Sequence, residues 1–416
     1  MAITDTSQLD FNAAAERLKT VVEHTPLMLN PRLSAKFGCK IYLKREDLQV
    51  VRSYKIRGAY NMMGSLPKEQ LAKGVVCASA GNHAQGFAYS CQLLKVRGVV
   101  FMPVITPKQK INKTKLFGED FIEIRLVGDT YDDCSAAAKA YSKEKELTFI
   151  PPFDDYKIIE GQGTVGVEIL EDLPMVDYVL IPIGGGGLAA GVGSYFKQKS
   201  PNTKLIGVEA EGAPALHKAL EAGHPVMLDK IDSFADGVAV KRVGDITFPI
   251  CKELLDDLYL VPEGKACATL IKLYNEDAIV VEPAGALSIA ALTHFKDKIK
   301  GKNVVCIVSG GNNDIDRMQE IKERALQYEG LKHYFLIRFP QRPGALKQFL
   351  NEVLGPNDDV SRFEYMQKNN KETGPALVGI ELKARDDYFK LVERMKQFGI
   401  NYTELSKDNN LFEYLV

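Results

Sequence analysis

The sequence shows no pattern of a membrane-spanning segment or of a secretory signal, and we expect neither. No apolar run approaches the roughly 20 consecutive residues that a transmembrane helix needs. Residues Met1–Thr6 show no basic-then-apolar pattern of the kind that marks a secretory signal. Cysteines are few, seven in 416 residues, and none belongs to a Cys-x-x-Cys pair. A disulfide framework and a metal site are therefore not indicated, and we expect reduced thiols in the cytoplasm.

An excess of charge of one sign is also missing. Lys and Arg total 53 and Asp and Glu total 54, so the formal net charge is −1. The basic residues are dispersed, which argues against a nucleic-acid partner. Hydrophobic residues make up 45% of the chain and charged residues 26%, a balance typical of a soluble globular protein. The length exceeds one ordinary domain, so we expect two or three.

Most of the chain alternates between short β-branched runs and helical stretches. Several of the runs are apolar almost throughout, which is typical of strands buried on both faces of a parallel sheet. Helices are predicted between them, for example over Gly81–Leu94 and Leu188–Gln198. This alternation predicts an open α/β architecture with ligands at the carboxyl ends of strands. The predicted strands are Val75–Ser79, Val99–Val104, Phe121–Val127, Tyr178–Ile183, Lys204–Glu209 and Asn303–Ser309.

The pattern changes after about Tyr328. The order β-α-β-β-α-β over some 85 residues predicts an appended ferredoxin-like module with its own small sheet. A Pro-Gly turn at Pro340–Gly344 follows its first strand. We therefore expect a first region over residues 1–325, with a smaller subdomain at about 51–150, and a module over 326–416. The predicted elements of the module are a strand from Lys332, a helix over Ala345–Leu354, strands over Ser361–Met366 and Ala376–Leu382, a helix over Asp386–Phe398 and a strand over Leu411–Leu415.

A run of four glycines follows one predicted strand and precedes a helix. Gly184, Gly185, Gly186 and Gly187 with Leu188 would present backbone N–H groups at a helix N-terminus, a geometry that binds phosphate. A flexible turn is the alternative.

Lys55, in the run Ser53–Ala59, lies just before a predicted helix. A lone lysine is usually a solvated surface charge. A desolvated lysine, in contrast, keeps its amine free near neutral pH and can react with an aldehyde.

Polar groups follow two further strands. The N–H groups and hydroxyl of Ser79-Ala80-Gly81 would suit a carboxylate, and Asn82 can donate to a phenolate oxygen, although it would also serve as a plain helix cap. His83 is better explained as a packed or solvated histidine. Ser309 would suit a ring nitrogen or simply a turn. An amine, a phosphate nest and a ring-nitrogen partner together indicate pyridoxal phosphate.

Two acidic positions admit ordinary roles. Glu282 opens a predicted helix and would complement its dipole. Glu209 lies at the end of a predicted strand, where carboxylates can bind a cation, but no full ligand set is visible, so we predict no metal.

Taken together, these residues resemble the threonine dehydratases (threonine ammonia-lyases) of the tryptophan-synthase-β, or fold type II, class of pyridoxal-phosphate enzymes. The resemblance spans about residues 10–325, and its motifs fall in the family's order. The module after them resembles the single ACT-like domain of isoleucine-pathway threonine dehydratases, with Arg342–Leu346 at its turn. The matching motifs are Lys44–Gln49, Ser53–Ala59, Ser79–His83, Gly161–Thr164, Gly184–Leu188, Glu282–Ala286 and Ser309–Asn312.

The resemblance implies a role for each site residue. Lys55 would carry the cofactor and then remove the substrate's α-proton, and Gly184–Leu188 would hold the phosphate. Asn82 would meet the 3-oxygen of the cofactor, and Ser309 its ring nitrogen. Ser79, Ala80, Gly81, His83 and Gln162 are the implied substrate contacts.

One departure separates this chain from serine racemases, which resemble it. They carry a serine where this chain has Ala80, and that serine acts as a second acid or base. Their cation site is only partly matched, by Glu209 and Ala213, since Ala215 stands where an acidic ligand is expected. The alanine at position 80 disfavours racemisation.

The resemblance therefore implies deamination of L-threonine to 2-oxobutanoate and ammonia, with L-serine as a second substrate. Isoleucine is the implied effector, with valine a second candidate, and the assembly a homotetramer or homodimer. Three alternatives stay open: a serine dehydratase or racemase, a catabolic threonine dehydratase, and an amino-acid sensor with a silent catalytic region.

Overall fold

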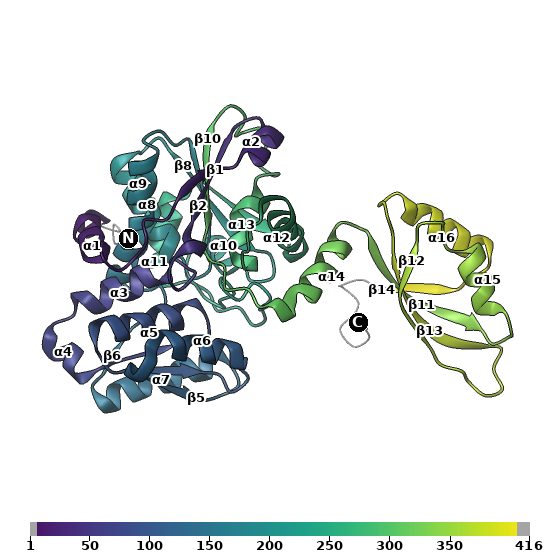
Figure 1. The fold of residues 1–416 in the computed structure, drawn as a ribbon, viewed down its shortest axis with the longest axis horizontal. Coiled ribbons are helices and arrows are strands. Elements are labelled where there is room, and N and C mark those ends of the chain that lie inside the picture. The colour runs from purple at the N-terminus through teal and green to yellow at the C-terminus, as the bar shows by residue number, and fades with distance from the viewer. Residues whose placement is uncertain (1–5, 406–416) are drawn as a thin grey trace. The chain divides into compact units, whose positions relative to one another are not determined.

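The structure, a computed structural model, describes residues 6–405. The chain divides into two compact units, residues 1–315 and 316–416. The first unit holds a six-stranded sheet and a smaller four-stranded one, both visible in Figure 1. The predicted α/β architecture is confirmed.

The larger sheet is parallel except at one edge. Only β1 runs antiparallel to its neighbour, β2. The central strands are almost completely buried, in agreement with their continuous apolar sequence. Its strands, in spatial order, are β1 (Leu27–Leu29), β2 (Lys40–Arg45), β10 (Asn303–Val308), β7 (Tyr178–Pro182), β8 (Lys204–Ala210) and β9 (Asp257–Val261).

The smaller sheet is parallel throughout and lies between β2 and β7 in the sequence. Its strands, in spatial order, are β5 (Ile122–Leu126), β4 (Gly98–Met102), β3 (Val75–Ala78) and β6 (Thr148–Phe149). The helices of the unit are α1 (Phe11–Leu18), α2 (Pro31–Phe37), α3 (Lys55–Ser65), α4 (Lys68–Lys73), α5 (Asn82–Leu94), α6 (Lys108–Gly118), α7 (Tyr131–Lys145), α8 (Tyr156–Asp172), α9 (Gly187–Lys199), α10 (Ala215–Ala222), α11 (Thr247–Leu254), α12 (Glu263–Asp277) and α13 (Pro283–Ala291).

Two small residues allow α3 and α8 to cross closely. A Cβ atom added at Gly161 of α8 would lie 2.5 Å from the carbonyl oxygen of Arg57 on α3, too close for any side chain. A Cβ atom at Gly58 would lie 2.4 Å from the amide nitrogen of Gln162. The crossing therefore fixes the start of α3, where Lys55 is the first helical residue.

The second unit carries a four-stranded antiparallel sheet in the order β12-β13-β11-β14. The predicted β-α-β-β-α-β order is confirmed. The predicted last strand, Leu411–Leu415, lies outside the described residues, and β14 takes the fourth place in the sheet. The elements are α14 (Met318–Tyr328), β11 (Lys332–Pro340), α15 (Ala345–Glu352), β12 (Asp359–Tyr365), β13 (Thr373–Glu381), α16 (Asp387–Gln397) and β14 (Tyr402–Leu405).

All six strands predicted for the first unit are present, and their ends differ from the predicted ones by at most two residues. Ser79 and Ser309, which we expected to end their strands, lie just beyond β3 and β10. Both residues therefore belong to the connecting segments that follow the strands. Within residues 6–405, no helix combines the length and apolar character needed to cross a membrane.

Candidate active site

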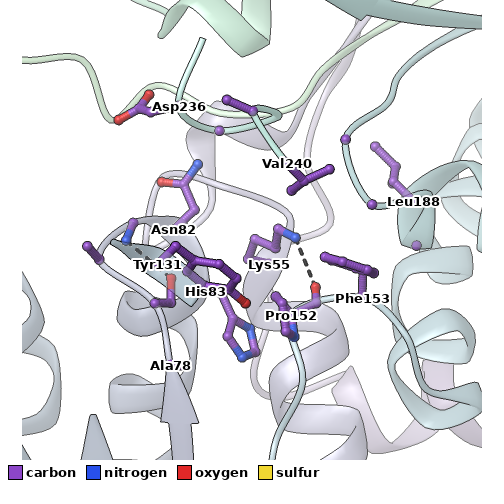
Figure 2. A pocket seen from close by; sticks show the side chains of 18 of the residues that line it. Lys55, Ala78, Asn82, His83, Tyr131, Pro152, Phe153, Leu188, Asp236 and Val240 are labelled. Carbon is purple, nitrogen blue, oxygen red and sulfur yellow. Dashed lines mark hydrogen bonds between the residues drawn. The ribbon is translucent and has the colours of Figure 1, made fainter. Parts of the chain in front are cut away.

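A cavity of about 230 Å³ opens in the first unit. Its walls include the segment that follows β3, from Ala78 to His83, and the segment that follows β7, from Pro182 to Leu188. The carboxyl ends of strands from both sheets therefore contribute to one cavity, where open α/β folds bind ligands. Figure 2 shows this cavity with Lys55, Asn82, His83 and Leu188 among its labelled side chains.

Lys55 enters the cavity from the start of α3. Its Nζ atom donates a hydrogen bond to the carbonyl oxygen of Pro152 at 2.9 Å, as Figure 2 shows. Burial lowers the pKa of the Lys55 ammonium to about 8, against a smaller opposing effect of the Glu282 carboxylate. The amine is therefore neutral in a substantial fraction of molecules near physiological pH, as a nucleophile or general base requires.

The glycine run forms a tight cradle at the start of α9. Gly186 has a φ of 92°, which L side chains rarely adopt. A Cβ atom at Gly185 would lie 2.3 Å from the ring of Phe153, and one at Gly184 would lie 2.7 Å from the carbonyl oxygen of Val238. The backbone is thus packed against neighbours that leave no room for side chains.

The N–H groups of this cradle are available to a ligand. In the part of the chain that the structure describes, the N–H groups of residues 184–188 donate no hydrogen bond. The carbonyl oxygen of Gly185, in contrast, accepts a hydrogen bond from Oγ1 of Thr247 at 2.6 Å. Free donors at a helix N-terminus suit a phosphate, so the cradle fits the phosphate of pyridoxal phosphate.

The segment Ser79–His83 lines the opposite part of the cavity. Ser79 accepts a hydrogen bond at Oγ from the N–H of Gly81 at 3.2 Å. Asn82 is the first residue of α5 and its side chain does not cap that helix, so the capping alternative is wrong. Its Nδ2 atom donates to Oε1 of Glu282 at 2.7 Å instead.

His83 is neutral in this setting. Its Nε2 atom lies 3.0 Å from the carbonyl oxygen of Ile150, which can only accept. Burial and the nearby Lys55 charge lower the pKa of His83 to about 3. His83 therefore lines the cavity as a packed side chain that donates to backbone, and it holds no proton that can be transferred at neutral pH.

Two of the expected site residues do not line the cavity. Ser309 is buried outside the lining residues, and its carbonyl oxygen accepts from the N–H of Tyr54, the residue before Lys55, at 3.3 Å. Gln162 is buried in the crossing of α3 and α8, with its amide nitrogen against Gly58. The structure brings the remaining expected residues together.

Glu282 is the N-cap residue of α13, where a carboxylate can complement the helix dipole, and it also has a partner at the cavity. Its carboxylate contacts Asn82, and the side chain is only 3% exposed. Burial and the nearby Asp236 carboxylate raise the pKa of Glu282 to about 7. The acid therefore lies within reach of the cavity wall rather than in solvent.

Several lining residues were missed by sequence reasoning. Lys110 and Asp236 line the cavity and form an ion pair with each other. Tyr131, Phe153 and Val240 also lie in its wall, as Figure 2 shows. These residues come from loops or helix starts that share no motif, so nothing local in the sequence indicated them.

The possible cation position is used by the protein itself. Both carboxylate oxygens of Glu209 accept backbone hydrogen bonds, from Leu216 at 2.7 Å and from His217 at 2.8 Å. Burial raises the pKa of Glu209 to about 8. Among the described residues, no group of three or more His, Cys, Asp or Glu is arranged to hold a metal ion.

Comparison with known proteins agrees with this site. Residues 18–310 match the family described as pyridoxal-phosphate dependent enzyme. Residues 323–415 match the C-terminal regulatory domain of threonine dehydratase.

Individual relatives cover nearly all of the chain. A biosynthetic L-threonine dehydratase of Halalkalibacterium halodurans is 57% identical, over 98% of this chain and 98% of its own. Among solved structures, the processed form of threonine deaminase isoform 2 from Solanum lycopersicum is 42% identical, with a TM-score of 0.73 over 77% of this chain and 93% of its own. Maize serine racemase is 30% identical, with a TM-score of 0.71 over 76% of this chain and 97% of its own. The chain therefore belongs to the biosynthetic L-threonine dehydratase family of pyridoxal-phosphate-dependent enzymes.

Proposed function

We propose that this chain converts L-threonine to 2-oxobutanoate and ammonia by β-elimination, the first step of isoleucine biosynthesis. The observation that carries the proposal is the shared cavity of Lys55 and Gly184–Leu188. One wall offers an amine whose pKa is lowered to about 8, and another offers unpaired N–H groups at a helix N-terminus. An aldehyde cofactor with a phosphate needs both.

The remaining residues would orient the cofactor and the substrate. Asn82 would donate to the 3-oxygen of the cofactor. The ring-nitrogen role of Ser309 would require its side chain to reach the bound ring from just outside the residues that line the cavity. The backbone of Ser79-Ala80-Gly81 and the start of α5 would bind the substrate carboxylate, since that helix N-terminus opens into the cavity. His83 would pack beside it as a neutral side chain.

Lys55 would act as the base at the α-carbon. Pyridoxal phosphate supplies an electron sink for the negative charge that develops there. The neutral Lys55 amine would remove the α-proton, and the backbone carbonyl of Pro152, which accepts from Nζ, would help to orient it. The side chains of Phe153 and Val240 add apolar surface to the wall of the same cavity.

Two related activities use the same lysine and cradle. A serine racemase would need a second acid or base where this chain has Ala80. The methyl group of alanine can neither donate nor accept a proton. Relative turnover separates the possibilities: we expect 2-oxobutanoate from L-threonine to form faster than pyruvate from L-serine, and little or no D-serine. Faster racemisation of serine than deamination of threonine would contradict the proposal.

The lowered pKa of Lys55 predicts a pH dependence for cofactor capture. Only the neutral amine attacks an aldehyde, so the rate at which cofactor-free protein takes up pyridoxal phosphate should rise with pH and level off above about pH 8. The rate can be followed by the absorbance of the bound cofactor. A midpoint near the ordinary lysine value of 10.5 would show that Lys55 is not desolvated.

The second unit would hold the effector. A cavity of about 130 Å³ lies beneath α15, with apolar walls that include Ile337, Phe349 and Ile400. Arg342 and Gln348 supply polar groups at the same cavity. An apolar cavity with a guanidinium group suits a branched amino acid, whose carboxylate can pair with the arginine. We propose isoleucine as the effector, with valine as a weaker one.

Arg342→Ala tests this assignment. The guanidinium now donates to Gln348 and is otherwise exposed, so its loss should leave the fold intact. Because a hydrogen bond to a charged group contributes about 1.5–3 kcal/mol, the isoleucine concentration for half-inhibition should rise at least tenfold by that estimate. Lys347→Ala, on α15 but outside the residues that line the cavity, is the control. Equal isoleucine sensitivity in both variants would remove Arg342 from the site.

The compartment and the assembly are also proposals. All seven cysteines are free and buried, which supports a reducing compartment, the cytoplasm. β12 and β14 are the two outer strands of the second unit's sheet, and such edges can pair between subunits. A homodimer or homotetramer would use them.

A further inference from the structure

Three side chains from separate elements form a chain of hydrogen bonds beside the cavity. Asn312 follows β10, Asn82 begins α5, and Glu282 precedes α13. Nδ2 of Asn312 donates to Oδ1 of Asn82 at 2.7 Å, and Nδ2 of Asn82 donates to Oε1 of Glu282 at 2.7 Å. Only Asn82 of the three lines the cavity.

The contact of Asn312 with Val51 determines which atoms donate and which accept in this series of hydrogen bonds. Nδ2 of Asn312 also donates to the backbone carbonyl oxygen of Val51 at 2.9 Å. A carbonyl oxygen can only accept, so the atom of Asn312 that faces it must be the amide nitrogen. The same nitrogen meets Asn82, so the atom of Asn82 at that contact must be its oxygen.

The second end has the same direction in the structure. The Glu282 carboxylate accepts from Asn82, and it keeps an acceptor oxygen whether or not it is protonated. Its position is tightly confined: a Cβ atom at Gly310 would lie 2.5 Å from Oε1, and one at Gly237 would lie 2.8 Å from it. The carboxylate of Glu282 is therefore packed closely against the backbone at Gly237 and Gly310.

The amide of Asn82 is thus engaged on both sides. Its oxygen already accepts from Asn312, and one hydrogen of its nitrogen is given to Glu282. The second N–H hydrogen is what remains for a ligand. An amide free to turn over could offer either its oxygen or its nitrogen.

We propose that Asn312 and Glu282 are positioning residues that make Asn82 a hydrogen-bond donor toward the cavity, so that the 3-oxygen of pyridoxal phosphate binds in its deprotonated form. This inference rests on the proposed cofactor role of Asn82. It assigns to Asn312 and Glu282 the function of fixing the orientation of the Asn82 amide. This function is separate from forming a turn or complementing a helix dipole.

A double-mutant cycle tests the proposal in the full-length protein. Asn312→Ala and Glu282→Gln each leave one anchor that holds the amide, so each should raise the dissociation constant of pyridoxal phosphate by no more than about threefold. The double variant loses both constraints, and its dissociation constant should rise by about 30-fold or more, beyond the product of the single effects. Fluorescence titration with pyridoxal phosphate gives all four constants.

The matched control is Asn303→Ala. Asn303 lies at the other end of β10, and its Nδ2 atom donates to the backbone oxygen of Met175 at 3.0 Å, as Asn312 donates to Val51. We expect no change in cofactor affinity. Multiplicative single effects in the cycle would overturn the proposal, because they would mean that Asn312 and Glu282 act independently.

A second measurement holds even if the double variant fails to fold. Asn82→Asp puts a carboxylate where the N–H now lies, and its charge should raise the pH at which the visible absorbance of the bound cofactor titrates. An unchanged titration would overturn the proposal. Wild-type protein that binds pyridoxal phosphate but does not deaminate threonine would refute only the proposed function, since neither readout depends on the substrate.

Discussion

Lys55→Ala is expected to lower threonine turnover by several orders of magnitude while the protein stays folded. The variant removes the group that would react with the cofactor and, at the same time, the base for the α-proton. General-base catalysis alone contributes typically about 10²–10⁴-fold, and loss of the covalent attachment adds to it. Lys55 makes a single side-chain hydrogen bond, to Pro152, so little of the fold depends on it.

Lys110→Ala is the informative comparison for this variant. Lys110 also lines the cavity, but its ammonium is already paired with Asp236. Its loss should therefore reduce turnover far less. Steady-state release of 2-oxobutanoate measures turnover, and circular dichroism checks the fold. Comparable losses in the two variants would show that the cavity needs positive charge rather than the Lys55 amine.

Arg57→Met is expected to destabilise the first unit strongly. The Arg57 side chain is completely buried and donates to two carboxylates, Glu46 at 2.8 Å and Glu168 at 2.6 Å. Lys44 is buried as well and donates to Glu168 at 2.5 Å. Without Arg57, two carboxylates would share one lysine in a dry environment. Removing one partner of a buried pair typically costs about 3–5 kcal/mol of unfolding free energy.

A surface pair provides the control for Arg57. Lys73 and Glu146 are 2.6 Å apart, but their side chains are 53% and 74% exposed. Lys73→Ala should change the free energy of unfolding by no more than about 1 kcal/mol. Urea unfolding of both variants measures the contrast, and equal effects would contradict the assigned importance of burial.

Acid should reduce the effect of the Arg57 substitution. In the folded protein the guanidinium of Arg57, together with Lys44, overcomes the opposing effect of burial and lowers the pKa of Glu46 below its ordinary value of 4.5. A carboxyl group with a lowered pKa stabilises the fold above its unfolded-state pKa and loses that contribution as pH falls through the folded-state value. The difference between wild type and variant should therefore be largest near neutral pH and shrink below about pH 4.5.

The predictable features were those with local signals. The glycine run between a buried strand and a helix predicted the cradle, and Lys55 before a predicted helix was placed in the same cavity by the fold. The strands were predicted because their apolar residues are continuous. In each case the structure depends on the properties of a few residues that are adjacent in the sequence. Gly186 is an example, because its positive φ favours glycine at that position.

The features that escaped prediction depend on distant contacts. Arg57 and Glu168 are 111 positions apart, and Asn82 and Glu282 are 200 apart. Nothing local distinguishes Glu282 from an acid that complements a helix dipole, and only the approach of Asn82 adds a partner at the cavity. Gln162 belongs to a family motif, yet its side chain packs against Gly58 because two helices cross there.

The most direct test of the account is to identify the lysine that holds the cofactor. Full-length protein loaded with pyridoxal phosphate is reduced with borohydride, which makes the lysine–cofactor bond permanent, and is then digested for peptide mass analysis. The account predicts one modified peptide, carrying the cofactor on Lys55. Modification at Lys110 or another lysine, or no modified peptide in protein that deaminates threonine, would contradict it.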